Sequence, residues 1–168
     1  MTIIRKLAAD DAVDAFACGR SALDRYLQRY AWANQKANSA QTYVATAVDA
    51  VVGYYSLSVA GVDWADAPHR IGKGLARHPV PVMLLARLAV RLDWQGRGTG
   101  RALLRDALLR TLQAADIAGI RAMLVQAKDE AARQWYLRWN FEPSPTNPLH
   151  LFLLLKDIQH AAHSTMRL

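Results

Sequence analysis

Three closely spaced glycines constrain the fold of this chain more than any other feature of its sequence. They occur in the run Gln95-Gly96-Arg97-Gly98-Thr99-Gly100, which joins two segments of different character. Before the run, residues 82–92 are almost continuously apolar, which is typical of a strand buried on both faces. From Thr99 to about Asp116, leucine and alanine recur at helical spacing. The sequence therefore predicts a buried strand, a tight turn and a helix.

Such a turn is suited to binding a pyrophosphate. Glycines allow the backbone to expose successive amide groups, and the helix that follows contributes the positive end of its dipole. Arg97 and Arg101 can add charge-assisted hydrogen bonds at the rim. A P-loop is excluded because no lysine follows Gly100, and a Rossmann turn is excluded because the spacing is G-x-G-x-G. A purely structural strand-to-helix turn remains the alternative.

The other elements are predicted from periodicity and turn residues. Ser21 is a plausible N-cap, Asp49-Ala50 separates two strands of a hairpin, and Gly53 marks a bulge or a close approach. This order argues for an α/β fold in which one domain, residues 1–168, has a central mixed sheet. We expect strands at 2–6, 41–48, 51–62, 82–92, 120–126 and 149–155, helices at 7–17, 21–35, 99–116 and 130–138, and a long loop at 63–81.

Composition limits the class of protein. The apolar stretches are too short to span a bilayer and the first residues do not resemble a secretion signal, so we expect a cytoplasmic protein without a membrane segment. The single cysteine, Cys18, permits no internal disulfide and no cysteine metal cluster, and is expected to be a small packing residue. We expect no metal site.

The net charge of +7 is concentrated in one part of the chain. Residues 70–105 hold eight basic residues and one acid, so the rest is formally neutral. A concentrated cationic field indicates a polyanion as partner, either coenzyme phosphates or nucleic acid. A solvated basic surface that serves only solubility is the alternative.

The turn also carries a resemblance. Gln95, Gly98 and Gly100 fit the Q-x-x-G-x-G pyrophosphate motif of the GNAT acetyltransferases. The resemblance implies a GNAT fold, a central mixed and splayed β-sheet flanked by helices on both faces, with acetyl-CoA as cosubstrate. It also implies that the backbone of the preceding strand receives the pantetheine arm, much as a sheet edge receives a strand. The implied coenzyme-binding residues are Leu88, Ala89, Val90, Gln95, Gly96, Arg97, Gly98, Thr99, Gly100 and Arg101.

A second motif lies on the predicted helix at 130–138. Ala132, Tyr136 and Asn140-Phe141 resemble the A-x-x-x-Y-x-x-x-G-F pattern of the same family, with asparagine where glycine is usual. The resemblance implies that Tyr136 protonates the departing coenzyme A thiolate. Tyrosine suits this step because its reference pKa of about 10 keeps it protonated at neutral pH. The alternative is a half-buried aromatic residue on an amphipathic helix. No general base is evident.

Further runs are similar to GNAT toxins of type II toxin–antitoxin systems; these are 16–19, 23–27, 40–44, 79–90 and 141–145. This likeness implies a toxin that acetylates the α-amino group of aminoacyl-tRNA and blocks translation. It also implies a ribbon-helix-helix antitoxin, operator DNA as partner of the complex, and a homodimer. Candidate contacts to tRNA phosphates are Lys36, Arg77, Arg87 and Arg91, each of which could instead serve coenzyme phosphates, solubility or the antitoxin.

Two rival functions remain open from the sequence. One is a GNAT enzyme that acetylates a small amine or a protein N-terminus, which would not need the basic region. The other is a non-catalytic binding module in which the glycine turn is structural and the basic surface holds DNA or a partner protein.

Overall fold

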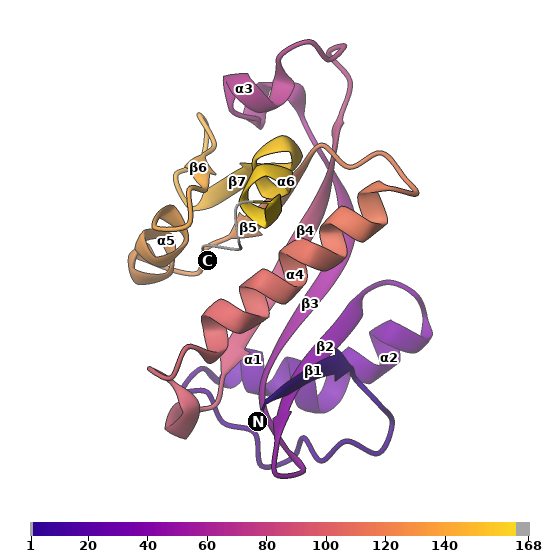
Figure 1. Cartoon of the computed structure of the whole chain (residues 1–168), viewed down its shortest axis with the longest axis vertical. Coiled ribbons are helices and arrows are strands. Elements are labelled where there is room, and N and C mark those ends of the chain that lie inside the picture. Colours follow the sequence, from indigo (N-terminus) through magenta and orange to yellow (C-terminus); the bar gives the residue numbers. More distant parts are fainter. Residues whose placement is uncertain (1, 164–168) are drawn as a thin grey trace. The chain divides into compact units, whose positions relative to one another are not determined.

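The chain forms an α/β structure with seven strands, which are hydrogen-bonded in the order β1-β2-β3-β4-β5-β7-β6 (Figure 1). A computed structural model describes residues 2–163. β4 and β5 are parallel, whereas β1–β2, β2–β3, β5–β7 and β6–β7 are antiparallel, so the sheet is mixed as predicted. The strands are β1 Ile3–Lys6, β2 Gln41–Ala47, β3 Ala50–Val62, β4 Val80–Val90, β5 Ala122–Gln126, β6 Glu142–Pro143 and β7 His150–Leu154.

The helices alternate with the strands along the chain, and the chain divides into two compact units. The first unit comprises the chain up to Ser58 together with Ala86–Ala107, and the second comprises Val59–Leu85 and the chain from Leu108. The division falls within β3, β4 and the helix α4. The helical elements are α1 Ser21–Arg25, the π-helical turn η1 Tyr26–Tyr30, α2 Ala31–Lys36, η2 Trp64–Asp66, α3 His69–Gly72, η3 Leu92–Trp94, α4 Thr99–Ala115, α5 Glu130–Leu137 and α6 Leu155–His163.

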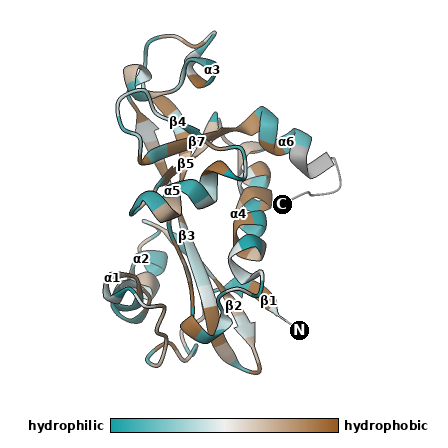
Figure 2. Ribbon diagram, turned by 90° about the vertical axis from the view of Figure 1, so that its left-hand side faces the viewer, coloured by the Kyte–Doolittle hydropathy of each residue, from teal (hydrophilic) through white to brown (hydrophobic). Residues whose placement is uncertain are grey.

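In the first unit, helices cover both faces of the sheet (Figure 2). Tyr54 faces α1, where its hydroxyl donates to the carbonyl of Leu23 over 2.6 Å. Tyr55 faces the opposite side and donates to Asp106 of α4 over 2.5 Å. Neighbouring residues of a strand point to opposite faces, so β3 supplies one tyrosine to each layer.

The hairpin of β2 and β3 contains the bulge that glycine predicts. Ala45 pairs with Gly53 but Thr46 pairs with Val51, so Val52 is the extra residue. A Cβ atom at Gly53 would lie 2.9 Å from Leu103 and 3.1 Å from the Ala89 carbonyl oxygen. The expectation of a bulge and a close approach at Gly53 is therefore confirmed. The predicted turn residues were one position late, because Val48 and Asp49 form the turn, with φ of 49° and 60°.

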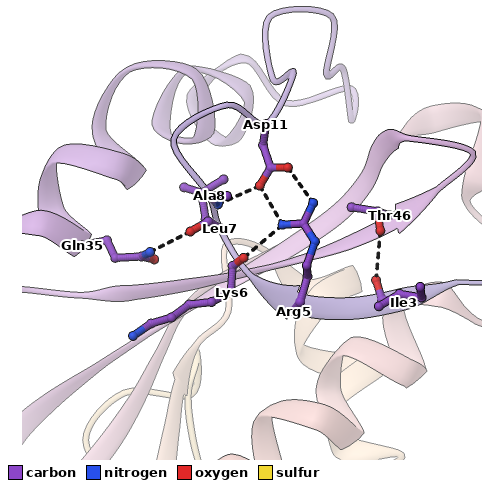
Figure 3. Close-up of polar contacts among 8 residues, drawn as sticks. All are labelled: Ile3, Arg5, Lys6, Leu7, Ala8, Asp11, Gln35 and Thr46. Atoms are coloured by element: carbon purple, nitrogen blue, oxygen red, sulfur yellow. Dashed lines mark hydrogen bonds and ion pairs between the residues drawn. The ribbon is translucent and has the colours of Figure 1, made fainter.

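The predicted helix at 7–17 was wrong. These residues form turns in which side chains, from the segment itself and from elsewhere, bind the backbone groups that a helix needs (Figure 3). Gln35 Nε2 donates to the Leu7 carbonyl over 2.8 Å, and Asp11 accepts from the Ala8 amide over 2.7 Å. Gln28 donates to two further carbonyls of this segment. Local and long-range side-chain bonds thus compete with the i to i+4 ladder.

We expect Asp11→Asn to lower the free energy of unfolding by about 1 kcal/mol at neutral pH, since Arg5 is partly exposed and solvent screens the pair. Arg5 donates to both Asp11 oxygens, over 2.6 and 2.9 Å, and these hydrogen bonds lower the pKa of Asp11. Stabilisation by a carboxylate with a lowered pKa is complete above its unfolded pKa of about 4 and is lost as the pH falls through the lowered value. Urea unfolding at pH 7 and pH 3 measures both effects. Equal pH dependence in the wild type and the variant would contradict this account.

The helical segment from Ser21 to Lys36 is confirmed, with two corrections. Ser21 is the first helical residue rather than the N-cap, which is Arg20 and makes no side-chain capping bond. In the π-helical turn, the Ala31 amide donates to the Tyr26 carbonyl, five residues earlier. The wider turn shifts the helical phase, so Tyr26 and Ala31 are buried while Tyr30, predicted on the same face, is 51% exposed.

In the second unit, the predicted loop at 63–81 contains η2 and α3. Ile71 of α3 is completely buried with residues of β4, β5 and β7. Arg121 donates to the carbonyls of Ile71 over 2.9 Å and Lys73 over 3.3 Å, which satisfies the C-terminal end of this short helix. No sequence pattern predicts β6 or α6, and α6 continues directly from β7.

None of the helices within residues 2–163 is long and apolar enough to span a membrane. Among the same residues, no group of three or more His, Cys, Asp and Glu side chains could hold a metal ion.

Candidate active site

The glycine turn lies where the sequence predicts it, in the first unit between η3 and α4. Gly96 and Gly98 have φ of 76° and 82°, a region that side chains other than glycine rarely adopt. A Cβ atom at either position would meet no heavy atom within 4 Å. The conformation therefore requires glycine, and the space beside it is open. These two properties fit a backbone that approaches a phosphate closely at a helix N-terminus.

The side chain of Gln95 connects this turn by hydrogen bonds to two neighbouring segments. Its side-chain nitrogen donates to the Val90 carbonyl at the end of β4 over 2.9 Å and to the Cys18 carbonyl over 3.0 Å. The Leu92 amide donates to Ala17 over 3.0 Å, so the turn is joined to residues 17–18 at two points. The side chain of Gln95 therefore acts as a brace within the protein.

We expect Gln95→Met to weaken acetyl-CoA binding about tenfold, because it removes two hydrogen bonds worth about 1 kcal/mol each without adding charge. Calorimetry measures the Kd. Gln113→Met is a matched control, since Gln113 is exposed on α4 outside the turn. Equal affinities of Gln95→Met and the wild type would show that the brace has no role in coenzyme binding.

The other predicted residues of the turn differ in their environments. Thr99 is buried at the first position of α4, and Arg101 is exposed one helical position after Gly100. The guanidinium carbon of Arg97 lies 4.9 Å from the centroid of the Trp94 ring. Trp94, which sequence reasoning did not single out, thus supports an arginine at the rim.

The strand residues predicted to meet the pantetheine arm lie at the end of β4. The register with β5 ends at Leu85 opposite Val125, whereas β4 continues to Val90. The last five residues of β4 therefore extend beyond the β5 ladder. Among them, Ala89 is buried and Leu88 and Val90 are partly buried. A strand end of this kind has backbone groups that can pair with a peptide-like chain.

Tyr136 lies in the second unit, on α5. Asp129 caps this helix by accepting from the Ala132 amide over 2.8 Å, and Asn140 follows it with φ of 69°, the left-handed conformation expected there. The Tyr136 ring makes edge contacts with Trp135 and Phe141 and is 9% exposed. Burial raises the pKa of Tyr136 well above its usual value. The raised pKa keeps the hydroxyl protonated at neutral pH. It makes no hydrogen bond to another described residue, so it is available as a donor.

The four candidates for tRNA contacts have different partners. Arg91 donates two hydrogen bonds to Asp93, over 2.6 and 2.9 Å. Arg87 lies over the Tyr26 ring, 3.7 Å from its centroid, and Arg77 lies 4.8 Å from the Trp64 centroid. Lys36 is exposed at the end of α2. Arg77 belongs to the second unit and the other three to the first.

The basic region is partly neutralised by acids from distant parts of the sequence. Arg70 donates to Glu142 over 3.0 Å and to Asp157 over 3.1 and 3.2 Å. Together with the Arg91–Asp93 pair, this reduces the cationic field that the sequence count implies. No local sequence pattern predicts the ion pairs of Arg70, because Glu142 and Asp157 lie 72 and 87 residues away in the sequence.

Comparisons with known proteins agree with this geometry. A family described as "Acetyltransferase (GNAT) domain" matches residues 38–143. The chain is 46% identical over 153 residues to the tRNA-acetylating toxin of Mycobacterium tuberculosis (strain ATCC 25618 / H37Rv), a match that covers 91% of this chain and 92% of the relative.

Solved structures show the same fold. AtaT complexed with acetyl-methionyl-tRNAfMet is 27% identical with a TM-score of 0.89, covering 96% of this chain and 99% of that one. AtaTR bound with AcCoA is 27% identical with a TM-score of 0.83, covering 96% and 98%. The AtaT-AtaR complex bound to DNA is 26% identical with a TM-score of 0.78, covering 95% and 99%. The chain therefore belongs to the GNAT acetyltransferase family, in the group that contains the tRNA-acetylating toxins.

Proposed function

We propose that this protein is an acetyl-CoA-dependent N-acetyltransferase that acetylates the α-amino group of aminoacyl-tRNA and thereby blocks translation. The observation that carries the proposal is the 46% identity, over nine-tenths of the chain, to a tRNA-acetylating toxin. The glycine turn and the buried tyrosine of α5 support it, because they are the two groups that coenzyme binding and thiolate protonation need.

In this reaction the neutral α-amino nitrogen attacks the acetyl carbonyl of the thioester, the N–C bond forms, the C–S bond breaks, and the amine loses a proton to water. Tyr136 donates its proton to the departing thiolate. An aminoacyl ester needs no strong base, since its amino group has a pKa at or below about 8 and a substantial fraction of it is neutral at physiological pH. We propose that the backbone of Leu88 to Val90 and the turn from Gln95 to Gly100 hold the coenzyme, with Arg97 and Arg101 at the rim.

We further propose the partners that such a toxin needs. Lys36, Arg77, Arg87 and Arg91 are candidate contacts to tRNA phosphates. A ribbon-helix-helix antitoxin would neutralise the enzyme, and operator DNA would bind the complex; the AtaT structures with the antitoxin AtaR and with DNA support this proposal. The protein would act as a homodimer in the cytoplasm, where charged tRNA is found. Residues 1–168 would form one catalytic domain, since the family match at 38–143 includes parts of both units.

Acceptor choice tests the proposal. Purified protein is incubated with labelled acetyl-CoA and, separately, with charged tRNAs, uncharged tRNAs, free amino acids, small amines and peptides. We expect label on charged tRNA alone. Equal or faster transfer to a small amine or a peptide N-terminus would favour the rival enzyme, and failure to bind acetyl-CoA would favour a non-catalytic module.

A further inference from the structure

Arg87 combines a fixed position with an unneutralised charge. It lies on β4, is partly buried, and its guanidinium carbon is 3.7 Å from the Tyr26 ring centroid. Within residues 2–163 its side chain makes no ion pair and no hydrogen bond. Arg91 differs in this respect because its Nε and one terminal nitrogen donate to the two carboxylate oxygens of Asp93.

The aromatic platform beneath Arg87 is rigid. Tyr26 is 5% exposed and stacks on Tyr54, with centroids 6.3 Å apart and ring planes 18° apart. Phe16 packs edge-on against Tyr54. Each tyrosine hydroxyl is engaged, since Tyr26 accepts from Asn34 over 3.3 Å and Tyr54 donates to Leu23 over 2.6 Å. The ring under the guanidinium therefore cannot turn without disturbing this core.

This arrangement leaves Arg87 prepared for an anion. A guanidinium that stacks by its face keeps its N–H donors at the edge, in a fork that matches phosphate oxygens. A partly buried cation without an acid is unfavourable until an anion binds. Asp24, whose carboxylate accepts from the Cys18 amide over 2.9 Å, makes no ion pair with Arg87 in the described part of the chain.

The position of Arg87 favours the acceptor substrate over the coenzyme as source of the phosphate. The proposed pyrophosphate site is the turn that Gln95 joins to Val90. Arg87 precedes Val90 by three residues, or about 10 Å along a strand. It therefore lies toward the thioester end of the strand assigned to pantetheine. We infer that Arg87 binds a phosphate of the tRNA acceptor end and that Tyr26 is its positioning residue, an inference that rests on the proposed function.

Salt-dependent binding tests this assignment. Affinity for charged tRNA is measured from low to moderate salt for the wild type, Arg87→Ala and a control, Arg29→Ala, which removes an exposed arginine from the same helical segment as Tyr26. We expect Arg87→Ala to weaken binding about tenfold at low salt and to reduce the slope of log K against log salt by about 0.7 to 1. Arg29→Ala should keep the wild-type slope.

Conservative variants of Arg87 and Tyr26 distinguish a role in positioning the guanidinium from a role in folding. Arg87→Lys keeps the charge but not the planar fork, so it should retain the slope with a several-fold weaker affinity. Tyr26→Phe keeps the ring and should bind as the wild type does. Tyr26→Leu should weaken binding several-fold with an unchanged slope, because the arginine remains but is no longer held.

Two outcomes would overturn the inference alone. The first is a salt slope for Arg87→Ala equal to that of the wild type, when the wild type itself binds tRNA. The second is an Arg87→Ala variant that loses affinity for acetyl-CoA but keeps its affinity for tRNA, which would assign the phosphate to the coenzyme. A wild-type protein without salt-dependent affinity for tRNA would overturn the proposed function as well.

Discussion

Tyr136→Phe is expected to lower kcat by at least about 100-fold, the usual contribution of a general acid. The variant removes only the hydroxyl, which makes no hydrogen bond to another described residue, and keeps the ring contacts with Trp135 and Phe141. Stability and the Kd for acetyl-CoA should therefore stay near the wild-type values. Steady-state kinetics with charged tRNA, calorimetry and thermal unfolding measure the three quantities.

A matched control and the pH profile sharpen this prediction. Tyr30→Phe removes the same hydroxyl from a residue that is 51% exposed, and should leave kcat unchanged. Because burial raises the pKa of Tyr136, any fall in rate that its deprotonation causes should begin at a higher pH than an exposed tyrosine would give. A kcat within twofold of the wild type would remove Tyr136 from the mechanism.

Gly98→Ala is expected to weaken acetyl-CoA binding by about tenfold or more. At φ of 82° an L-residue costs about 1–2 kcal/mol, so the turn will relax and its amides will move from the positions proposed to hold the pyrophosphate. The new methyl group would also occupy the open space beside the backbone. Calorimetry measures the loss of affinity, and urea unfolding measures the loss of stability.

Gly74→Ala is the control for this substitution. Gly74 has φ of 80° and also has no heavy atom within 4 Å of an added Cβ, but it lies in the loop before β4. It should lose similar stability while acetyl-CoA affinity stays unchanged. If both variants bound acetyl-CoA equally well, the turn would be a structural connection only.

The sequence predicted the parts of this fold that local chemistry determines. The glycine turn, the left-handed Asn140 and the close approach at Gly53 each follow from a backbone conformation or a spacing that few residues allow. The family expectation rested on the glycine turn, on the Tyr136 motif and on further runs such as 79–90, and the match at 38–143 confirms it. The roles of individual site residues remain predictions.

The errors arose where distant residues decide the structure. Helical spacing at 7–17 was misleading because Gln35 and Gln28 bind its carbonyls from another segment. The charge count over residues 70–105 overstated the cationic field, since Glu142 and Asp157 neutralise Arg70. The stack of Arg87 on Tyr26 joins residues 61 positions apart, so no motif predicts it.

The identity of the reaction product tests the central claim most directly. Charged tRNA is treated with protein and acetyl-CoA, digested with a ribonuclease that releases the 3′-terminal adenosine with its amino acid, and analysed by mass spectrometry. The account predicts adenosine that carries an N-acetylated amino acid, formed by the wild type and greatly reduced with Tyr136→Phe. Unmodified aminoacyl-adenosine after complete incubation, or an acetyl group on a base or ribose, would contradict it.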